Sequence, residues 1–207
     1  MSYCNWDTTS EINRRYHDEE WGVPVFDDDR HQFEHLMLEV MQCGLSWDLI
    51  INRREIFRQC FNNFDFTKIA KYTDADITRI MDTPGMIRSP RKINAIISNA
   101  NKFIELRAKE GSFCDYLWCH TDGKIIVYDK HPDGYIPASN GLSTKISSDL
   151  RARGFKYVGP ITIYSHLQST GLIHDHDKHC PRHQAILGSH QAITLPCHAE
   201  NNVRFYG

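Results

Sequence analysis

Two predicted helices meet in the stretch Leu-Glu-Val-Met-Gln-Cys-Gly-Leu-Ser-Trp, residues 38–47. Before the break at Gly44, apolar residues recur at i, i+3, i+4, i+7 and i+8, which is the spacing of one helical face. These residues are Phe33, Leu36, Met37, Val40 and Met41. Ser46 is a suitable N-cap for a second helix that begins with Trp47. The stretch therefore predicts an amphipathic helix, a break, and a second helix with an aromatic residue in its first turn.

Glu39 lies at the edge of that apolar face. Its helical neighbours are Leu36 and Cys43, so its carboxylate borders apolar surface rather than the solvated charges. A carboxylate in this position either pairs with a structural partner or has a functional role in binding or catalysis. Trp47, in turn, is either a core residue or a flat platform for a ligand. The two residues flank one turn, and their role depends on the rest of the chain.

The composition favours one compact domain, which a chain of 207 residues can also fold as two lobes. No run approaches the roughly 18 apolar residues of a membrane helix. The N-terminus lacks the basic and apolar pattern of a signal peptide, so we expect a cytoplasmic protein. The net charge of −2 means that any binding of nucleic acid must come from local basic patches.

The cysteines and histidines indicate a metal site. Seven scattered cysteines, an odd number, do not form a disulfide framework in a chain of this size. His176 and Cys180 are spaced i, i+4, and Cys4 and His17 supply two more soft ligands near the other terminus. Such a set suits a closed, tetrahedral, structural zinc that ties the chain ends together. The alternative is a buried Cys4 and a surface cluster of histidines. The competing ligands are His174, His179 and His183.

Two further predicted helices are joined by a Thr-Pro-Gly turn at residues 83–85. The first follows a capping box at residues 73–76, and the second carries an apolar face over residues 93–104. With basic residues beyond the turn, this arrangement resembles a phosphate-binding helix-hairpin-helix, whose amides and helix N-terminus face the anion. Position 87 is Ile where such hairpins usually carry a second glycine, so a plain helix turn is the alternative.

The C-terminal half is less regular. Residues 124–128 fit a short strand, and residues 132–140 have the composition of a loop. Helices are predicted over residues 144–153 and again from Pro160 through Gln168. From about Leu187 onward we predict an irregular tail, either disordered or specific to this family.

Several stretches within residues 1–183 together resemble the 3-methyladenine DNA glycosylase I family. They occur in the family's order and at roughly its spacing. The stretches are Cys4-x-Trp6, Tyr16-His17-Asp18-x-Glu20-Trp21-Gly22-Val23-Pro24, Leu38-Glu39, Gln42-x-Gly44-Leu45-Ser46-Trp47, Ile87-Arg88 with Lys92-Ile93, Arg153-Gly154-Phe155-Lys156-x-Val158-Gly159, and Asp175-His176-x-x-x-Cys180.

The resemblance implies an all-α, two-lobed fold of the helix-hairpin-helix glycosylase superfamily. We expect one glycosylase domain over residues 1–187, a tail of unknown role over residues 188–207, and a monomer. The resemblance also implies one structural Zn2+ per chain, held by the residues that match the family's ligands. Those residues are Cys4, His17, His176 and Cys180.

The family's base pocket maps onto Glu39, as the catalytic residue, and onto Tyr16 and Trp47, with Trp6 and Trp21 close by. Adenine methylated at N3 is cationic, so its glycosidic bond is already weakened and it leaves as a neutral base. The enzyme therefore needs selection more than acid catalysis. A carboxylate attracts the cation, and an electron-rich ring stacks on it. The predicted DNA-binding residues are Gly85, Arg88, Arg91 and Lys92, with Ser165 and Lys156 as weaker candidates.

These features predict a DNA repair enzyme that acts on double-stranded DNA containing alkylated adenine. It flips the damaged base into the pocket, hydrolyses its N-glycosidic bond and leaves an abasic site without cutting the strand. One alternative is a zinc-stapled DNA-binding protein of the same fold without turnover. Another is a hydrolase of free nucleosides.

The chain departs from the family pattern at several positions. Asn13 and Val40 bear on the shape of the base pocket, and Pro90, like Ile87, bears on the hairpin's contact with DNA. Two histidines, His166 and His174, also replace residues usual in the family. These departures bear on the base preference of the pocket and on how firmly the hairpin binds DNA.

Overall fold

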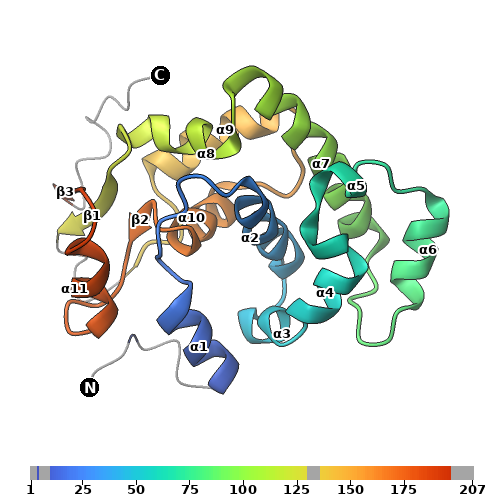
Figure 1. The fold of residues 1–207 in the computed structure, drawn as a ribbon, viewed down its shortest axis with the longest axis horizontal. Helices are drawn as coiled ribbons and strands as arrows, with labels where there is room; N and C mark the ends of the chain where they lie inside the picture. The colour runs from blue at the N-terminus through green and yellow to red at the C-terminus, as the bar shows by residue number, and fades with distance from the viewer. Residues whose placement is uncertain (1–3, 5–9, 130–135, 197–207) are drawn as a thin grey trace.

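The computed structural model describes residue 4, residues 10–129 and residues 136–196. Helices dominate the described chain (Figure 1). The α-helices are α1 Glu11–Glu19, α2 Asp29–Gln42, α3 Trp47–Ile51, α4 Arg54–Cys60, α5 Phe66–Ile69, α6 Asp74–Asp82, α7 Pro90–Glu110, α8 Phe113–Trp118, α9 Gly141–Ala152, α10 Pro160–Ser169 and α11 Pro181–Leu187, with short 3-10 turns η1 Asn62–Phe64 and η2 Cys119–Thr121. None of the helices in these described ranges is both long and apolar enough to cross a bilayer.

A small parallel sheet corrects the prediction of an all-α fold. Its strands are β1 Ile125–Asp129, β2 Ile173–His174 and β3 Ala192–Pro196, with β1 in the middle. β1 is the strand expected within residues 124–128. β3 was missed, because its five residues lie in the stretch predicted to be an irregular tail. Residues 193 and 195 are half-buried while their neighbours are exposed, which is the alternation of a strand with one covered face. The segment forms this strand because it pairs with β1.

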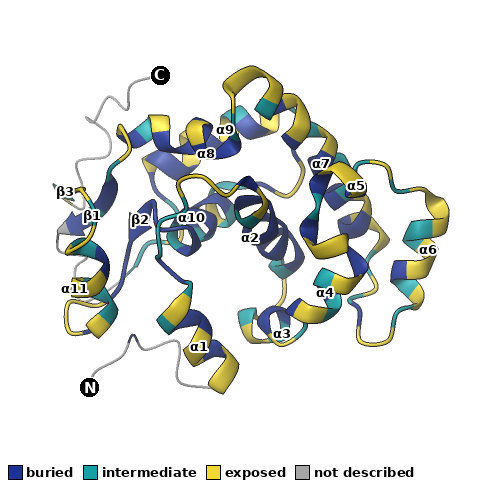
Figure 2. Cartoon of the chain, in the orientation of Figure 1, coloured by how far each residue is buried: buried dark blue, intermediate teal, exposed yellow. Residues whose placement is uncertain are grey.

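Helix α2 is the central element of the fold, and α7, α8 and α10 pack around it (Figure 1). Eleven of its fourteen residues are buried, so it is covered on nearly all sides rather than on one face as predicted. Figure 2 shows the buried surfaces of the surrounding helices turned toward it. This burial takes polar side chains of α2, Glu39 among them, out of water.

The break after α2 follows the prediction from residues 38–47. α2 ends at Gln42, Gly44 has φ +79°, and α3 begins at Trp47. The Ser46 hydroxyl caps α3 by accepting from the amide of Leu49 at 3.3 Å. The predicted capping box before α6 is also present, formed by Thr73 and Asp76. Local sequence therefore fixes these helix ends.

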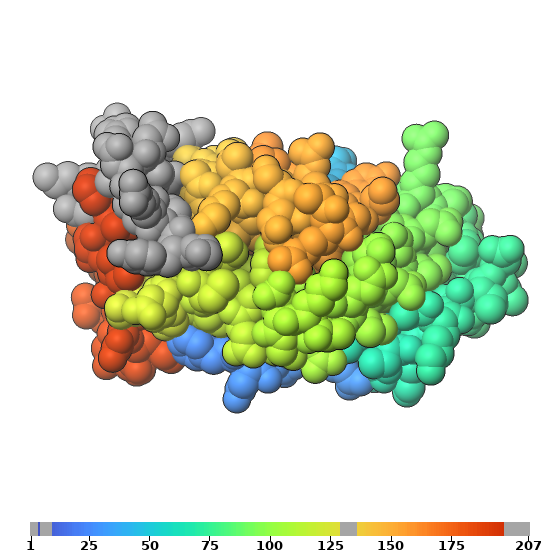
Figure 3. Space-filling view, turned by 90° about the horizontal axis from the view of Figure 1, so that it is seen from above, coloured from blue at the N-terminus to red at the C-terminus, as the bar shows by residue number. Residues whose placement is uncertain are grey.

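The two ends of the described chain meet on one side of the molecule. Cys4 lies against the segment between β2 and α11, where its Sγ accepts from the amide of Asp177 at 3.3 Å. Figure 3 shows the C-terminal elements at one end of the long axis and the α4–α6 region at the other. The N-terminal residues and the C-terminal turn thus form a single corner of the fold.

Candidate functional site

A pocket with a volume of about 260 Å³ opens between α1, α2, α3 and α10. The predicted base-binding residues Tyr16, Trp21 and Trp47 line it together with Glu39. Trp6, the other predicted base-binding residue, lies outside the described residues. The pocket is lined by Tyr16, Trp21, Glu39, Gln42, Trp47, Ile136, Ser165 and Gln168. Four residues distant in sequence, predicted to act on one ligand, are thus brought to one cavity.

The pocket also contains residues that the sequence reasoning missed or placed elsewhere. Gln42 lies three residues after Glu39, on the same face of the helix, so its place in the pocket could have been predicted from this spacing. No sequence pattern points to Gln168 or Ile136 as pocket residues. Ser165, a weaker candidate for DNA binding, lines the pocket. Polar groups from α2 and α10 therefore face one another across the cavity.

Glu39 is a buried acid without a counter-charge. Its side chain is 6% exposed, and no ion pair involves its carboxylate in the described part of the chain. Burial raises the pKa of Glu39 to about 8. The carboxyl group is therefore mostly protonated at neutral pH, and a cation placed in the pocket would favour its ionised form.

The aromatic wall of the pocket is held by contacts between α1 and α3. The rings of Tyr16 and Trp47 lie 5.1 Å apart at 44°. Asn13, one of the departures from the family pattern, donates to Asp48 at 2.9 Å and so ties the two helices together. Val40, the other departure near the pocket, is buried in the core. Neither residue lines the cavity, so its shape does not depend directly on their side chains.

The Trp47 indole has an unused hydrogen-bond donor. Its Nε1 is buried and has no hydrogen-bond partner among the residues that the structure describes. Buried donors are nearly always paired, so an unpaired one beside a cavity indicates a place for a ligand or a water molecule. The indole thus offers a stacking face and a donor at the same site.

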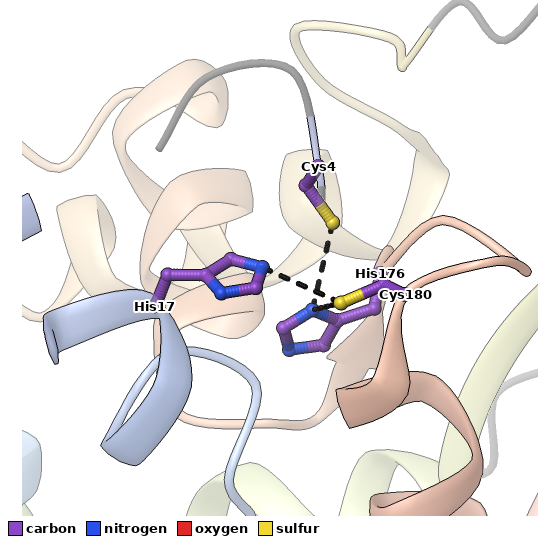
Figure 4. Close-up of side chains that lie close together, drawn as sticks. All are labelled: Cys4, His17, His176 and Cys180. Atoms are coloured by element: carbon purple, nitrogen blue, oxygen red, sulfur yellow. Dashed lines mark hydrogen bonds between the residues drawn. The ribbon is translucent and has the colours of Figure 1, made fainter. Parts of the chain in front are cut away.

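A second group of buried side chains joins the chain ends beside this pocket: Cys4, His17, His176 and Cys180 (Figure 4). Three S···N distances, Cys4–His176, Cys180–His17 and Cys180–His176, are each 3.6 Å. Tetrahedral zinc with bonds of about 2.3 Å to sulfur and 2.0–2.1 Å to nitrogen would separate such atoms by about 3.5–3.6 Å. The four predicted ligands therefore have the chemistry and the spacing of a closed zinc site.

Outer contacts orient both imidazoles of this group. His17 Nδ1 lies 2.8 Å from Asp18 Oδ1, which leaves Nε2 directed at Cys180. His176 Nε2 lies 2.9 Å from the carbonyl oxygen of Trp21, which leaves Nδ1 directed at both thiols. Such partners fix the tautomer of a ligating histidine. The second contact also joins this group to the pocket wall, since Trp21 lines the pocket.

The competing histidines do not complete this set. His174 Nε2 and His183 Nδ1 lie 3.0 Å apart and face each other. His179 is exposed. Within the described ranges, the group that can hold a metal at this corner is the predicted one.

The predicted DNA-contacting residues divide into exposed and buried ones. Arg88 and Arg91 are exposed beside the turn between α6 and α7. Gly85 has φ +79°, and its carbonyl accepts from Arg53 at 2.9 Å. Gly85 is in a left-handed conformation, and neither guanidinium group has an ion-pair partner within the described ranges, so this turn is available to a phosphate.

Lys92 does not fit the predicted phosphate contact. It is 9% exposed, and its Nζ donates to the carbonyls of Met41 at 2.6 Å and Cys43 at 2.7 Å. A cation at the C-terminus of a helix satisfies carbonyls that lack an intrahelical partner. Lys92 therefore caps α2, directly after Glu39 and Gln42.

Lys92→Met should therefore destabilise the protein rather than weaken its phosphate contacts. We expect a loss of about 2–4 kcal/mol in the free energy of unfolding, because one buried and one partly buried carbonyl lose a charged donor. Urea unfolding measures this change, with Lys71→Met as a control at an exposed lysine. A variant of unchanged stability that binds DNA with a reduced salt dependence would instead support the phosphate contact.

Residues 6–183 match the family model described as methyladenine glycosylase. The chain is 38% identical over 178 residues to the DNA-3-methyladenine glycosylase of Haemophilus influenzae, covering 86% of this chain and 96% of that protein. The crystal structure of a 3-methyladenine DNA glycosylase I superposes with a TM-score of 0.83 at 38% identity, over 88% of this chain and 100% of that one. A Tyr-to-Phe variant of such an enzyme in complex with 3-methyladenine superposes with a TM-score of 0.82 at 33% identity, over 87% and 97% of the two chains. The chain therefore belongs to the methyladenine glycosylase family.

Proposed function

We propose that this protein hydrolyses the N-glycosidic bond of 3-methyladenine in alkylated double-stranded DNA. The observation that carries the proposal is Glu39, a buried acid that lines a pocket beside the Trp47 indole and has no counter-charge among the described residues. Family membership supports the same activity. Base flipping brings the damaged base out of the duplex and into this pocket, and hydrolysis leaves an abasic site.

Selection of a cationic base follows from the charge state of Glu39. A neutral adenine does not compensate a negative charge on Glu39. The carboxyl group therefore stays protonated when such a base occupies the pocket, because a buried carboxylate without a counter-charge is unfavourable. A methylated, cationic adenine supplies the missing counter-charge, and the ionised carboxylate accepts from its N–H groups. The damaged base therefore binds more tightly than the undamaged one, because only the damaged base forms an ion pair with Glu39 away from water.

The remaining pocket residues hold the base. Trp47 presents a face for stacking, Tyr16 a hydroxyl group, and Gln42 an amide that can donate and accept. Ser165 acts on the flipped nucleotide rather than on distant phosphates, because it lines the cavity. No lysine lines the pocket in the described ranges, and we infer simple hydrolysis without a covalent intermediate.

The Cys4, His17, His176 and Cys180 group holds one structural zinc in this proposal. All four positions of a tetrahedral ion are filled by protein, so the ion would stabilise the fold and take no part in hydrolysis. One continuous core links α2 to α11, which supports a single two-lobed domain over residues 1–187. The monomeric state and the cytoplasmic location remain predictions from the sequence.

The DNA backbone contacts the turn between α6 and α7, at Gly85, Arg88 and Arg91. Arg88→Ala should weaken binding of duplex DNA several-fold at low salt and reduce the slope of log K against log salt by about 1. Fluorescence anisotropy at four salt concentrations measures both quantities. Lys71→Ala, at an exposed lysine on a different turn, is the control. An unchanged salt slope would remove Arg88 from the phosphate contacts.

Single-turnover release of 3-methyladenine from alkylated duplex DNA tests the function. We expect release with enzyme in excess and no turnover of free nucleosides. DNA binding without release would favour the alternative of a zinc-stapled DNA-binding protein. Hydrolysis of free nucleosides at a comparable rate would favour the nucleoside hydrolase.

A further inference from the structure

A second cluster of ligating side chains lies behind the pocket, formed by Glu20, His31 and His35. His31 and His35 are one turn apart on α2, and Glu20 follows the end of α1. One nitrogen or oxygen atom from each residue lies within 4.8 Å of the others. The His35 ring stacks on Tyr16 with centroids 6.0 Å apart, so the cluster adjoins the pocket wall.

The His35 side chain is buried inside this cluster, and its contact with a polar neighbour is longer than a normal hydrogen bond. It is 1% exposed, and neither of its ring nitrogens has a hydrogen-bond partner in the described part of the chain. Its Nε2 lies 3.6 Å from Glu20 Oε2, which is too long for a good hydrogen bond. Ligands at about 2.0–2.2 Å around a tetrahedral ion are about 3.3–3.6 Å apart. The separation of Glu20 and His35 therefore fits a shared metal ion.

The charged groups linked to the cluster have a net negative charge, which favours a bound cation. Arg54 donates to Glu20 and to Glu34, and Arg58 donates to Glu34 and to Glu55. Three carboxylates thus pair with two guanidinium groups in a linear network, Glu20–Arg54–Glu34–Arg58–Glu55, which carries an excess of one negative charge. Arg54 donates to both oxygens of Glu20, at 2.9 Å and 2.6 Å, and each of these oxygens keeps a further lone pair for an ion.

The histidines of the cluster are neutral at physiological pH. Burial lowers the pKa of His35 to about 4. Burial also lowers the pKa of His31. Neutral imidazole is the form that binds metal ions. The rings lie parallel, with centroids 4.5 Å apart, and one ring nitrogen of His31 lies within 4.8 Å of the ligand atoms of Glu20 and His35.

We propose that Glu20, His31 and His35 form a second metal site, which takes a divalent transition metal of the Zn2+, Co2+ and Ni2+ class. Two imidazoles and one carboxylate suit these ions, and three protein ligands leave a fourth position to water. The site is partly open to solvent through His31 and exchanges its ion more readily than the buried group of two cysteines and two histidines. The proposal is independent of the reaction that the pocket catalyses.

Titration of the purified, folded protein with Ni2+ tests this site. The zinc content is measured before and after the titration, so that Ni2+ in a second site is distinguished from exchange at the first. We expect one Ni2+ per chain beyond the resident metal, and a melting temperature that rises with Ni2+ concentration. No Ni2+ binding beyond replacement of resident zinc would overturn the proposal.

Two variants locate the binding. His31→Gln should weaken Ni2+ binding at least tenfold and leave the zinc content unchanged, because His31 is partly exposed and lies outside the other metal group. His120→Gln is the matched control, since His120 is another partly buried histidine whose ring nitrogens have no described partner. His31→Gln carries the test because replacing the buried His35 risks unfolding. Equal Ni2+ affinity in the wild type and His31→Gln would rule out this ligand set.

Discussion

Glu39→Gln is expected to slow single-turnover release of 3-methyladenine at least about 30-fold, while duplex DNA binds nearly as before. The amide keeps the shape of the side chain and removes the charge that pairs with the cationic base, an interaction worth about 2–5 kcal/mol when buried. Rapid-quench release with enzyme in excess measures the rate, and anisotropy measures DNA binding. Glu11→Gln changes the same charge at an exposed position and serves as the control. Equal losses in release and in DNA binding would contradict the assigned role.

The same variant should gain stability, and the gain should depend on pH. Glu39 has a pKa of about 8 in the folded protein and about 4.5 when exposed. Between these values the folded protein retains a proton that the unfolded chain has released, so wild-type stability falls as pH rises. We expect Glu39→Gln to exceed the wild type by about 2–4 kcal/mol at pH 8.5 and to match it near pH 4.5. Urea unfolding of both proteins at the two pH values measures the difference.

The pH dependence of turnover should mirror that of stability. Binding of the cationic base in the pocket needs the ionised form of Glu39, so kcat/KM for alkylated DNA should rise with pH toward the pKa of about 8 and then level off. Glu39→Gln removes the titrating group and should show a flat profile at its lower rate. A wild-type profile that is flat between pH 6 and 8.5 would show that the carboxyl group is already ionised in the free enzyme.

The residues that could be predicted from sequence are those fixed by local patterns. The end of α2, the Ser46 cap and the start of α3 follow from apolar spacing and capping within residues 38–47. Glu39 stood out for the same reason, as a carboxylate at the edge of an apolar face. The convergence of Tyr16 and Trp47 on it came from the family resemblance, because their approach depends on tertiary contacts between α1 and α3.

The roles that local sequence does not reveal have a common physical origin in contacts made across the fold. Lys92 follows a turn rich in cations, and nothing in its neighbourhood reveals that Met41 and Cys43 lie within reach of its side chain. β3 is a five-residue segment whose strand character depends on pairing with β1. Ser165 belongs to the pocket only because α10 packs against α2. Each of these roles is set by a partner far away in the chain.

Cys180→Ser is expected to lose the metal and much of the stability together. Cys180 lies 3.6 Å from both His17 and His176, and so joins the two ends of the chain. A serine hydroxyl is a poor ligand for zinc, and the remaining ligands would leave the corner open to water. We expect zinc to fall from about one per chain to near zero, with a loss of several kcal/mol in unfolding free energy, because metal binding contributes directly to folding.

Loss of the metal in Cys180→Ser should also weaken binding in the base pocket. The carbonyl of Trp21 is held by His176, and Trp21 lines the cavity, so a loosened corner should weaken base binding as well as stability. Elemental analysis, thermal melting with and without a chelator, and binding of free 3-methyladenine measure the three effects. Cys119→Ser, at an exposed thiol, is the control and should change none of them. A Cys180→Ser protein that keeps both its zinc and its melting temperature would rule out this ligand set, and the fold would then join its two ends by packing alone.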